Sequence, residues 1–160
     1  MKGYETMIKI LFVCHGNICR SPMAQYVLQD MVNKRHLESL FEIDSAATST
    51  EEIGNGVHYG TRSKLKQAGI PCGNHKARQL SWRDYDAYDF FIGMDEWNRR
   101  NMRRMLKGDP EGKVSLLLDY TARQRGIADP WYTGNFDETY NDVVEGCEAF
   151  INYLVRSARL

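Results

Sequence analysis

Long apolar runs are absent from this 160-residue sequence, and a membrane span requires roughly 18 consecutive apolar residues. The N-terminus also lacks a basic stretch followed by an apolar core, so we expect no secretory signal. Lys and Arg number 21, as do Asp and Glu, so no excess charge favours nucleic acid or anionic lipid as a partner. These absences predict a cytoplasmic protein that binds neither nucleic acids nor membranes.

Cysteine and proline are scarce, with four residues of each. The cysteines at positions 14, 19, 72 and 147 are too irregularly spaced for a disulfide framework. In a reducing compartment such thiols are metal-binding, catalytic or simply buried. No repeat or linker divides the chain, which predicts one domain over residues 1–160, with residues 1–6 frayed.

Four short apolar runs predict β-strands, at residues 8–13, 41–46, 88–94 and 114–118. Segments with helical spacing separate or follow them: one opens at Ser21 and Pro22, and others cover residues 61–68, 95–106 and 137–156. Alternating strands and helices favour an α/β fold, a doubly wound four-stranded parallel sheet with helices on both faces.

Two groups of residues within these helices have simple structural interpretations. Cys147 lies on the apolar stripe of the last helix, which predicts a buried structural thiol. The basic residues of the third helix are expected to form a solvated face: Arg99, Arg100, Arg103, Arg104 and Lys107.

The segment between the first strand and the first helix, residues 14–22, reads C-H-G-N-I-C-R-S-P. At the carboxyl edge of an α/β sheet its backbone N–H groups would curl toward a helix N-terminus, which attracts anions. Gly16 permits backbone geometry that other residues resist. The planar guanidinium of Arg20 can hold two oxygens of a tetrahedral anion at once. The segment therefore predicts a phosphate site.

Cys14 would lie at the base of that site, where amide dipoles and a guanidinium favour an ionised thiolate, a nucleophile for phosphoryl transfer. Ser21 can donate a hydrogen bond to the sulfur. The leaving oxygen needs a proton, and Asp129, in a stretch without helical pattern, can supply it. The alternatives are a buried inert Cys14, a zinc site on Cys14, His15 and Cys19, and plain turn chemistry at Asp129.

These motifs resemble the low-molecular-weight protein tyrosine phosphatases. The likeness runs from Met7 over nearly the whole chain. It includes the segment above, I-D-S-A at 43–46, H-K-A-R-Q-L at 75–80, G-M-D at 93–95 and D-P-W-Y at 129–132.

The resemblance implies a role for each matching residue. Cys14 would form a phosphocysteine, Arg20 would clamp the phosphate, and Asp129 would act first as acid and then as base. The phosphate would be bound by His15, Gly16, Asn17, Ile18, Cys19 and Arg20. Loop support would come from Asn17, Ser21, Ser45 and His75, and the substrate pocket from Ile18, Glu51, Trp131 and Tyr132. Cys19 could form a protective disulfide with Cys14.

The implied substrate is a phosphotyrosine-containing protein, with phosphate or vanadate as inhibitors and no cofactor or metal. Glu51 departs from the family, because many members carry an aromatic residue there, and Trp131 replaces a tyrosine. A protein-arginine phosphatase is the main alternative, although such members tend to carry Thr where this chain has Ile18. A non-catalytic phosphate-binding module is a second. An arsenate reductase or flavodoxin-like carrier fits the cysteines less well.

Overall fold

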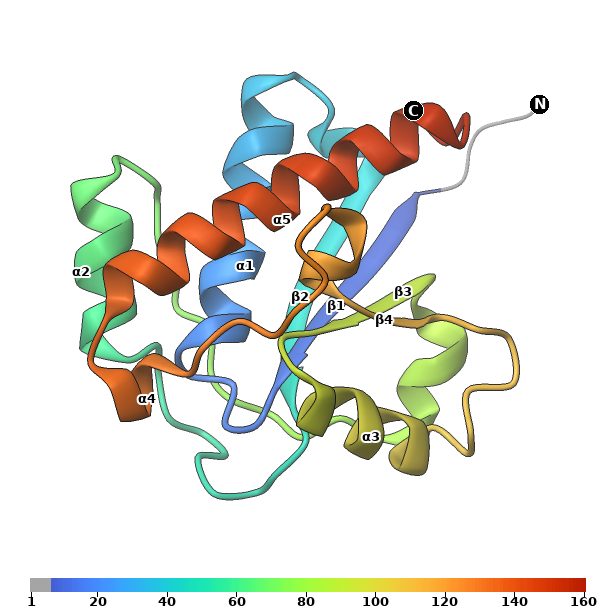
Figure 1. Ribbon diagram of the computed structural model, residues 1–160, viewed down its shortest axis with the longest axis horizontal. Helices are drawn as coiled ribbons and strands as arrows, with labels where there is room; N and C mark the ends of the chain where they lie inside the picture. The colour runs from blue at the N-terminus through green and yellow to red at the C-terminus, as the bar shows by residue number, and fades with distance from the viewer. Residues whose placement is uncertain (1–6) are drawn as a thin grey trace.

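The computed structural model describes residues 7–160, and its centre is a sheet of four parallel strands (Figure 1). The strands are β1 (Ile8–Cys14), β2 (Phe41–Ala47), β3 (Phe90–Gly93) and β4 (Val114–Leu116), in the order β2-β1-β3-β4. After β1, the chain forms β2 on one side of that strand and later forms β3 on its other side. The carboxyl end of β1 is therefore the switch point where α/β sheets bind ligands. The predicted four-stranded parallel sheet is confirmed.

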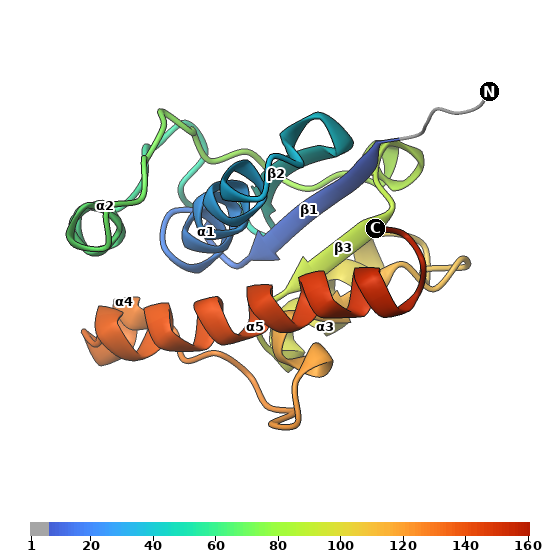
Figure 2. The same ribbon diagram turned by 90° about the horizontal axis from the view of Figure 1, so that it is seen from above.

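Helices cover both faces of this sheet, also as predicted. The helices are α1 (Arg20–Lys34), α2 (Tyr59–Gln67), α3 (Glu96–Met105), α4 (Pro130–Thr133) and α5 (Phe136–Arg156). One core joins alternate residues of β1 to α1 and α5, and Figure 2 shows α5 running lengthwise along the sheet. The second core packs the other face against α3 and the 3-10 segment Trp82–Ala87. Cys147 is fully buried in the first core, as its stripe predicted.

The structure differs from the sequence predictions in several segments. Both β3 and β4 are shorter than expected, and the chain after β4 turns into a 3-10 helix over Leu117–Tyr120. The stretch after Asp129 is a short helix, because Pro130 occupies its first turn and Asp129 caps it. The predicted fraying of residues 1–6 lies outside the described residues. None of the helices in residues 7–160 is both long and apolar enough to cross a membrane.

The prediction of a solvated basic face on α3 is wrong for one residue, Arg99. Its guanidinium lies 2.8 Å from Glu96 and 3.0 Å from Asp119, and these two carboxylates draw it against the end of β4. The other four basic residues are exposed as expected.

Candidate active site

The loop that leaves β1 places Cys14 at its start and Arg20 at the beginning of α1. Asn17 is the loop residue with left-handed backbone geometry, at φ 61°, and this turns its N–H to within 3.3 Å of Cys14 Sγ. The sequence had assigned the special conformation to Gly16. Gly16 has no positive φ, and a Cβ there would make only an ordinary contact with the Glu52 side chain, at 3.4 Å. Asparagine tolerates the left-handed region, and here its side chain is also fixed.

A buried hydrogen-bond network fixes Asn17 and reaches the sulfur. The Asn17 amide donates to Ser21 Oγ at 2.8 Å and to Ser45 Oγ at 2.9 Å. Its Oδ1 lies 2.8 Å from His75 Nε2 and can only accept, so His75 donates from Nε2. Burial lowers the pKa of His75. Because Ser21 accepts from Asn17, its own hydrogen remains for Cys14 Sγ, 3.0 Å away. The chain of donated hydrogen bonds therefore runs from His75 through Asn17 and Ser21 to the Cys14 sulfur.

Two residues at the edge of this network were not identified from the sequence. Gln25 Oε1 accepts from the Ser45 hydroxyl at 2.5 Å. Asp44 lies 3.5 Å from His75 Nδ1. Gln25 carries no motif signal, and the I-D-S-A segment contains Asp44 without indicating a role for it, because both contacts depend on the packing of distant segments.

Arg20 is buried and its guanidinium is held by groups from two distant loops. Nη1 donates to Asp95 Oδ2 at 2.7 Å and to the Ile127 carbonyl at 2.9 Å, while Nη2 lies 3.3 Å from Asp129 Oδ2. Burial alone would lower the pKa of Arg20, but the neighbouring Cys14, Asp95 and Asp129 raise it overall. The site therefore holds a fixed cation. Asp95 was not identified as a site residue, although its place directly after β3 is a signal for one.

Asp129 is oriented by its own helix cap and by the segment before it. Oδ1 accepts from Trp131 N at 3.0 Å, which leaves Oδ2 toward Arg20. The Thr139 hydroxyl on α5 donates to the Ala128 carbonyl at 3.1 Å, and Ile127 N donates to Met94 O at 2.8 Å. The sheet edge and α5 therefore set the position of this carboxyl group.

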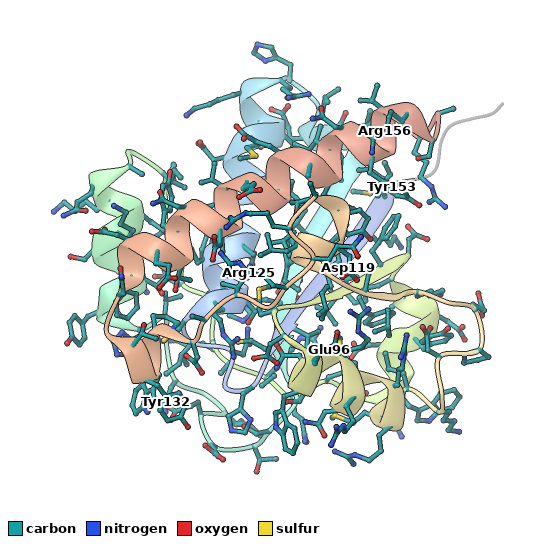
Figure 3. All side chains as sticks on the ribbon, viewed as in Figure 1. Glu96, Asp119, Arg125, Tyr132, Tyr153 and Arg156 are labelled. Atoms are coloured by element: carbon teal, nitrogen blue, oxygen red, sulfur yellow. The ribbon has the colours of Figure 1, made fainter. Side chains whose placement is uncertain are left out.

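The segment before Asp129 is also anchored to α5 by charge. Asp142, buried on α5, accepts from Arg123 at 2.9 Å and from Arg125 at 3.0 Å, and Figure 3 shows Arg125 beside that helix.

Replacing Asp142 with Asn removes the negative charge that both guanidinium groups share. We expect a loss of about 1–3 kcal/mol in the free energy of unfolding, measured by urea denaturation. The matched change Glu148→Gln, exposed on the same helix, is expected to cost under about 0.5 kcal/mol. Equal losses would show that Asp142 anchors nothing.

A cavity of about 100 Å³ opens above the loop and brings the predicted residues together. Its lining comprises Cys14, His15, Gly16, Asn17, Ile18, Cys19, Arg20, Glu51, Glu52, Asp129, Trp131 and Tyr132. Ser21, Ser45 and His75 lie outside the lining, in the supporting network. Glu52 is the one lining residue that sequence reasoning missed.

The mouth of the cavity has aromatic and acidic sides. Trp131 is 57% exposed and Tyr132 83%, so both offer open ring surfaces, and Figure 3 shows Tyr132 projecting outward from α4. Trp131 also packs edge-on against His58, with ring centroids 5.7 Å apart. On the acidic side, Glu51 Oε2 lies 3.0 Å from His15 Nε2 at the rim of the cavity. A flat substrate group therefore has apolar surface on one side only.

Cys19 is buried beside the loop, and burial, with Cys14 nearby, raises the pKa of its thiol to about 12. Its thiol is therefore protonated at neutral pH. Within residues 7–160, no three His, Cys, Asp or Glu side chains are grouped as metal ligands would be. Both Cys14 and Cys19 are free thiols in this structure.

Comparison with known proteins agrees with this geometry. A sequence model of the family "Low molecular weight phosphotyrosine protein phosphatase" matches residues 9–160. YfkJ of Bacillus subtilis, named a low molecular weight protein-tyrosine-phosphatase, is 38% identical over 96% of this chain and all of that protein. Its crystal structure superposes with a TM-score of 0.93 over 97% of this chain and 99% of that one.

Two further relatives are informative. The low molecular weight phosphotyrosine protein phosphatase of Gallus gallus is 40% identical over 89% of this chain and 92% of that protein. The crystal structure of DARP, a drosophila arginine phosphatase, has 32% identity and a TM-score of 0.84, over 91% of this chain and 97% of that one. The chain belongs to the low molecular weight phosphotyrosine protein phosphatase family.

Proposed function

We propose that this protein hydrolyses phosphotyrosine monoesters of proteins through a phosphocysteine intermediate. The observation that carries the proposal is the convergence of Cys14, Arg20 and Asp129 on one cavity at the switch point of the sheet. A nucleophile, a fixed cation and a carboxyl group at a cavity supply the three functions that phosphoryl transfer to sulfur requires.

In the first step, loop amides and Arg20 bind the phosphoryl oxygens. The Cys14 sulfur forms a bond to phosphorus as the bond from phosphorus to the phenolic oxygen breaks. Asp129 gives its proton to that departing oxygen. The Arg20 charge offsets the negative charge that the phosphoryl oxygens carry in the transition state.

In the second step, the Asp129 carboxylate takes a proton from water as that water attacks phosphorus. The bond from sulfur to phosphorus breaks and inorganic phosphate forms. The Ser21 hydroxyl, 3.0 Å from Cys14 Sγ, donates to the sulfur as it regains its negative charge. The network through Asn17 keeps that hydroxyl pointed at the sulfur in both steps.

Two further readings of the site differ in what they require. A non-catalytic phosphate-binding module needs the loop and Arg20 but neither Cys14 nor Asp129, and this chain has all four. The similarity to DARP is the observation that supports a protein-arginine phosphatase. Ile18, Trp131 and Tyr132 at the cavity support an aromatic leaving group instead, because apolar walls suit a phenyl ring better than a guanidinium.

Initial rates on matched phosphotyrosine and phosphoarginine peptides test this function. We expect kcat/KM for phosphotyrosine to be at least about tenfold higher, since pocket contacts of this kind are worth that much. Phosphate and vanadate are expected to inhibit, and EDTA to leave the rate unchanged. A higher kcat/KM for phosphoarginine would overturn the proposed substrate, and inhibition by EDTA would reinstate a metal.

The remaining expectations on partners follow from charge. The zero formal net charge provides no overall field that would favour nucleic acid or an anionic membrane surface. A cytoplasmic location stays a prediction.

A further inference from the structure

The solvent side of α3 carries a row of cations that the chemistry above does not use. We call this the cationic face of α3, and it comprises four residues of the helix and one just after it: Trp97, Arg100, Arg103, Arg104 and Lys107. All five are exposed, and none of the four cations forms an ion pair with another residue in 7–160. Their neighbour Arg99, by contrast, is neutralised by Glu96 and Asp119. The face is therefore a local positive field on a protein of zero formal net charge.

Two exposed tryptophans hold cations of this face in place. The Arg100 guanidinium lies over the Trp97 ring at 5.4 Å, and Lys107 Nζ lies 3.5 Å from the centre of the Trp82 ring. A cation stacked on an indole keeps its charge and loses little further freedom when it meets an anion. The face thus combines ordered positive charge with open apolar surface.

The N-terminus of α3 lies beside the active site. Asp95 caps the N-terminus of α3 with one carboxylate oxygen and binds Arg20 with the other. The ten residues of α3 extend about 15 Å, the span of roughly five residues of extended chain. Figure 1 shows α3 and α4 in the lower half of the view, on either side of the loop that leaves β1. A peptide leaving the cavity can therefore follow α3.

We infer that the cationic face of α3 binds an acidic segment of the phosphoprotein substrate, next to the phosphorylated residue. The inference rests on the proposed function, because it assigns a second contact to the same substrate. Glu51 and Glu52 line the cavity itself and repel such a segment there, so the charges direct it toward α3. A nucleic acid or an anionic membrane is less suitable, because the positive charge is confined to one short helix whose N-terminus lies beside the active site.

Three phosphotyrosine peptides test the inference: one with four Glu residues before the phosphotyrosine, one with four after it, and one with Gln throughout. The variant is Arg100→Gln/Arg103→Gln/Arg104→Gln. The matched control is Arg35→Gln/Lys66→Gln/Arg156→Gln, which removes the same charge from exposed positions at the C-terminal cap of α1, on α2 and on α5. A small aryl phosphate reports whether the cavity is intact.

At low salt, we expect the acidic peptide whose Glu residues lie over α3 to exceed the Gln peptide about tenfold in kcat/KM, because several exposed ion pairs each contribute modestly. The difference is expected in KM rather than in kcat. The α3 variant is expected to lose this advantage, the control variant to keep it, and about 0.5 M salt to remove it. The small aryl phosphate is expected to be hydrolysed equally by all three proteins.

Other outcomes separate the two proposals. Hydrolysis of all peptides without preference, or equal losses in both triple variants, would overturn the docking face and leave the proposed function standing. Absence of hydrolysis of every phosphotyrosine substrate would overturn the proposed function itself. A loss of oligonucleotide or anionic vesicle binding in the α3 variant, with peptide rates unchanged, would show that the partner is of another class.

Discussion

Replacing Cys14 with serine is expected to reduce turnover of an aryl phosphate at least about 10⁴-fold while phosphate or vanadate still binds. A hydroxyl stays protonated at neutral pH and is a far weaker nucleophile than a thiolate. The serine is nearly the same size, so the loop amides and Arg20 keep their positions. Steady-state rates measure the first effect, and calorimetric titration with phosphate measures the second.

The other cysteines supply the controls for this experiment. Cys72→Ser changes a partly exposed thiol outside the cavity and is expected to leave the rate unchanged. Cys19 cannot take over from Cys14, because burial raises the pKa of its thiol to about 12 and keeps it protonated. Turnover retained by Cys14→Ser would refute attack by that sulfur. If phosphate binding is lost together with turnover, Cys14 maintains the conformation of the loop and does not act as the nucleophile.

The parts of the site that the sequence predicted are those encoded locally. β1, the loop after it and the start of α1 are contiguous, so the strand pattern and the order of Cys14, Arg20 and Ser21 suffice to place a thiol and a guanidinium at one anion site. The same holds for the Asp129 cap, where Asp-Pro is visible. Its helix was missed because one turn of helix and an ordinary turn share that dipeptide signal.

The missed parts depend on contacts between distant segments. Asp95 meets Arg20 across 75 positions, and Asp119 meets Arg99 through the register of β3 with β4. Glu52 lines the cavity beside the loop that leaves β1, although more than 30 positions separate it from that loop. The left-handed residue was assigned to Gly16, since glycine is the usual choice, whereas the network around Asn17 holds an asparagine there. Asp95 lies in the G-M-D segment, but neither a motif nor periodicity indicates which distant side chain a residue will contact.

Replacing Asp129 with asparagine is expected to lower kcat/KM by about 10²- to 10⁴-fold for an aryl phosphate with a poor leaving group, and much less for one with a good leaving group. This ratio reports the steps up to release of the phenol, where a poor leaving group needs the proton and a good one does not. For the good leaving group a burst of phenol should precede slow turnover, because the variant also lacks the base for the second step. Stopped-flow absorbance measures both phases.

A second substitution at the same position separates proton transfer from helix capping. The asparagine oxygen can still accept from Trp131 N and cap α4, whereas Asp129→Ala removes the cap, at a cost of about 0.5–2 kcal/mol of stability. If Asp129 acts through its proton, the two variants lose similar activity and only the alanine variant loses stability. Equal losses for good and poor leaving groups would instead mean that Asp129 acts by orienting Arg20, 3.3 Å away, and that the proton comes from another group.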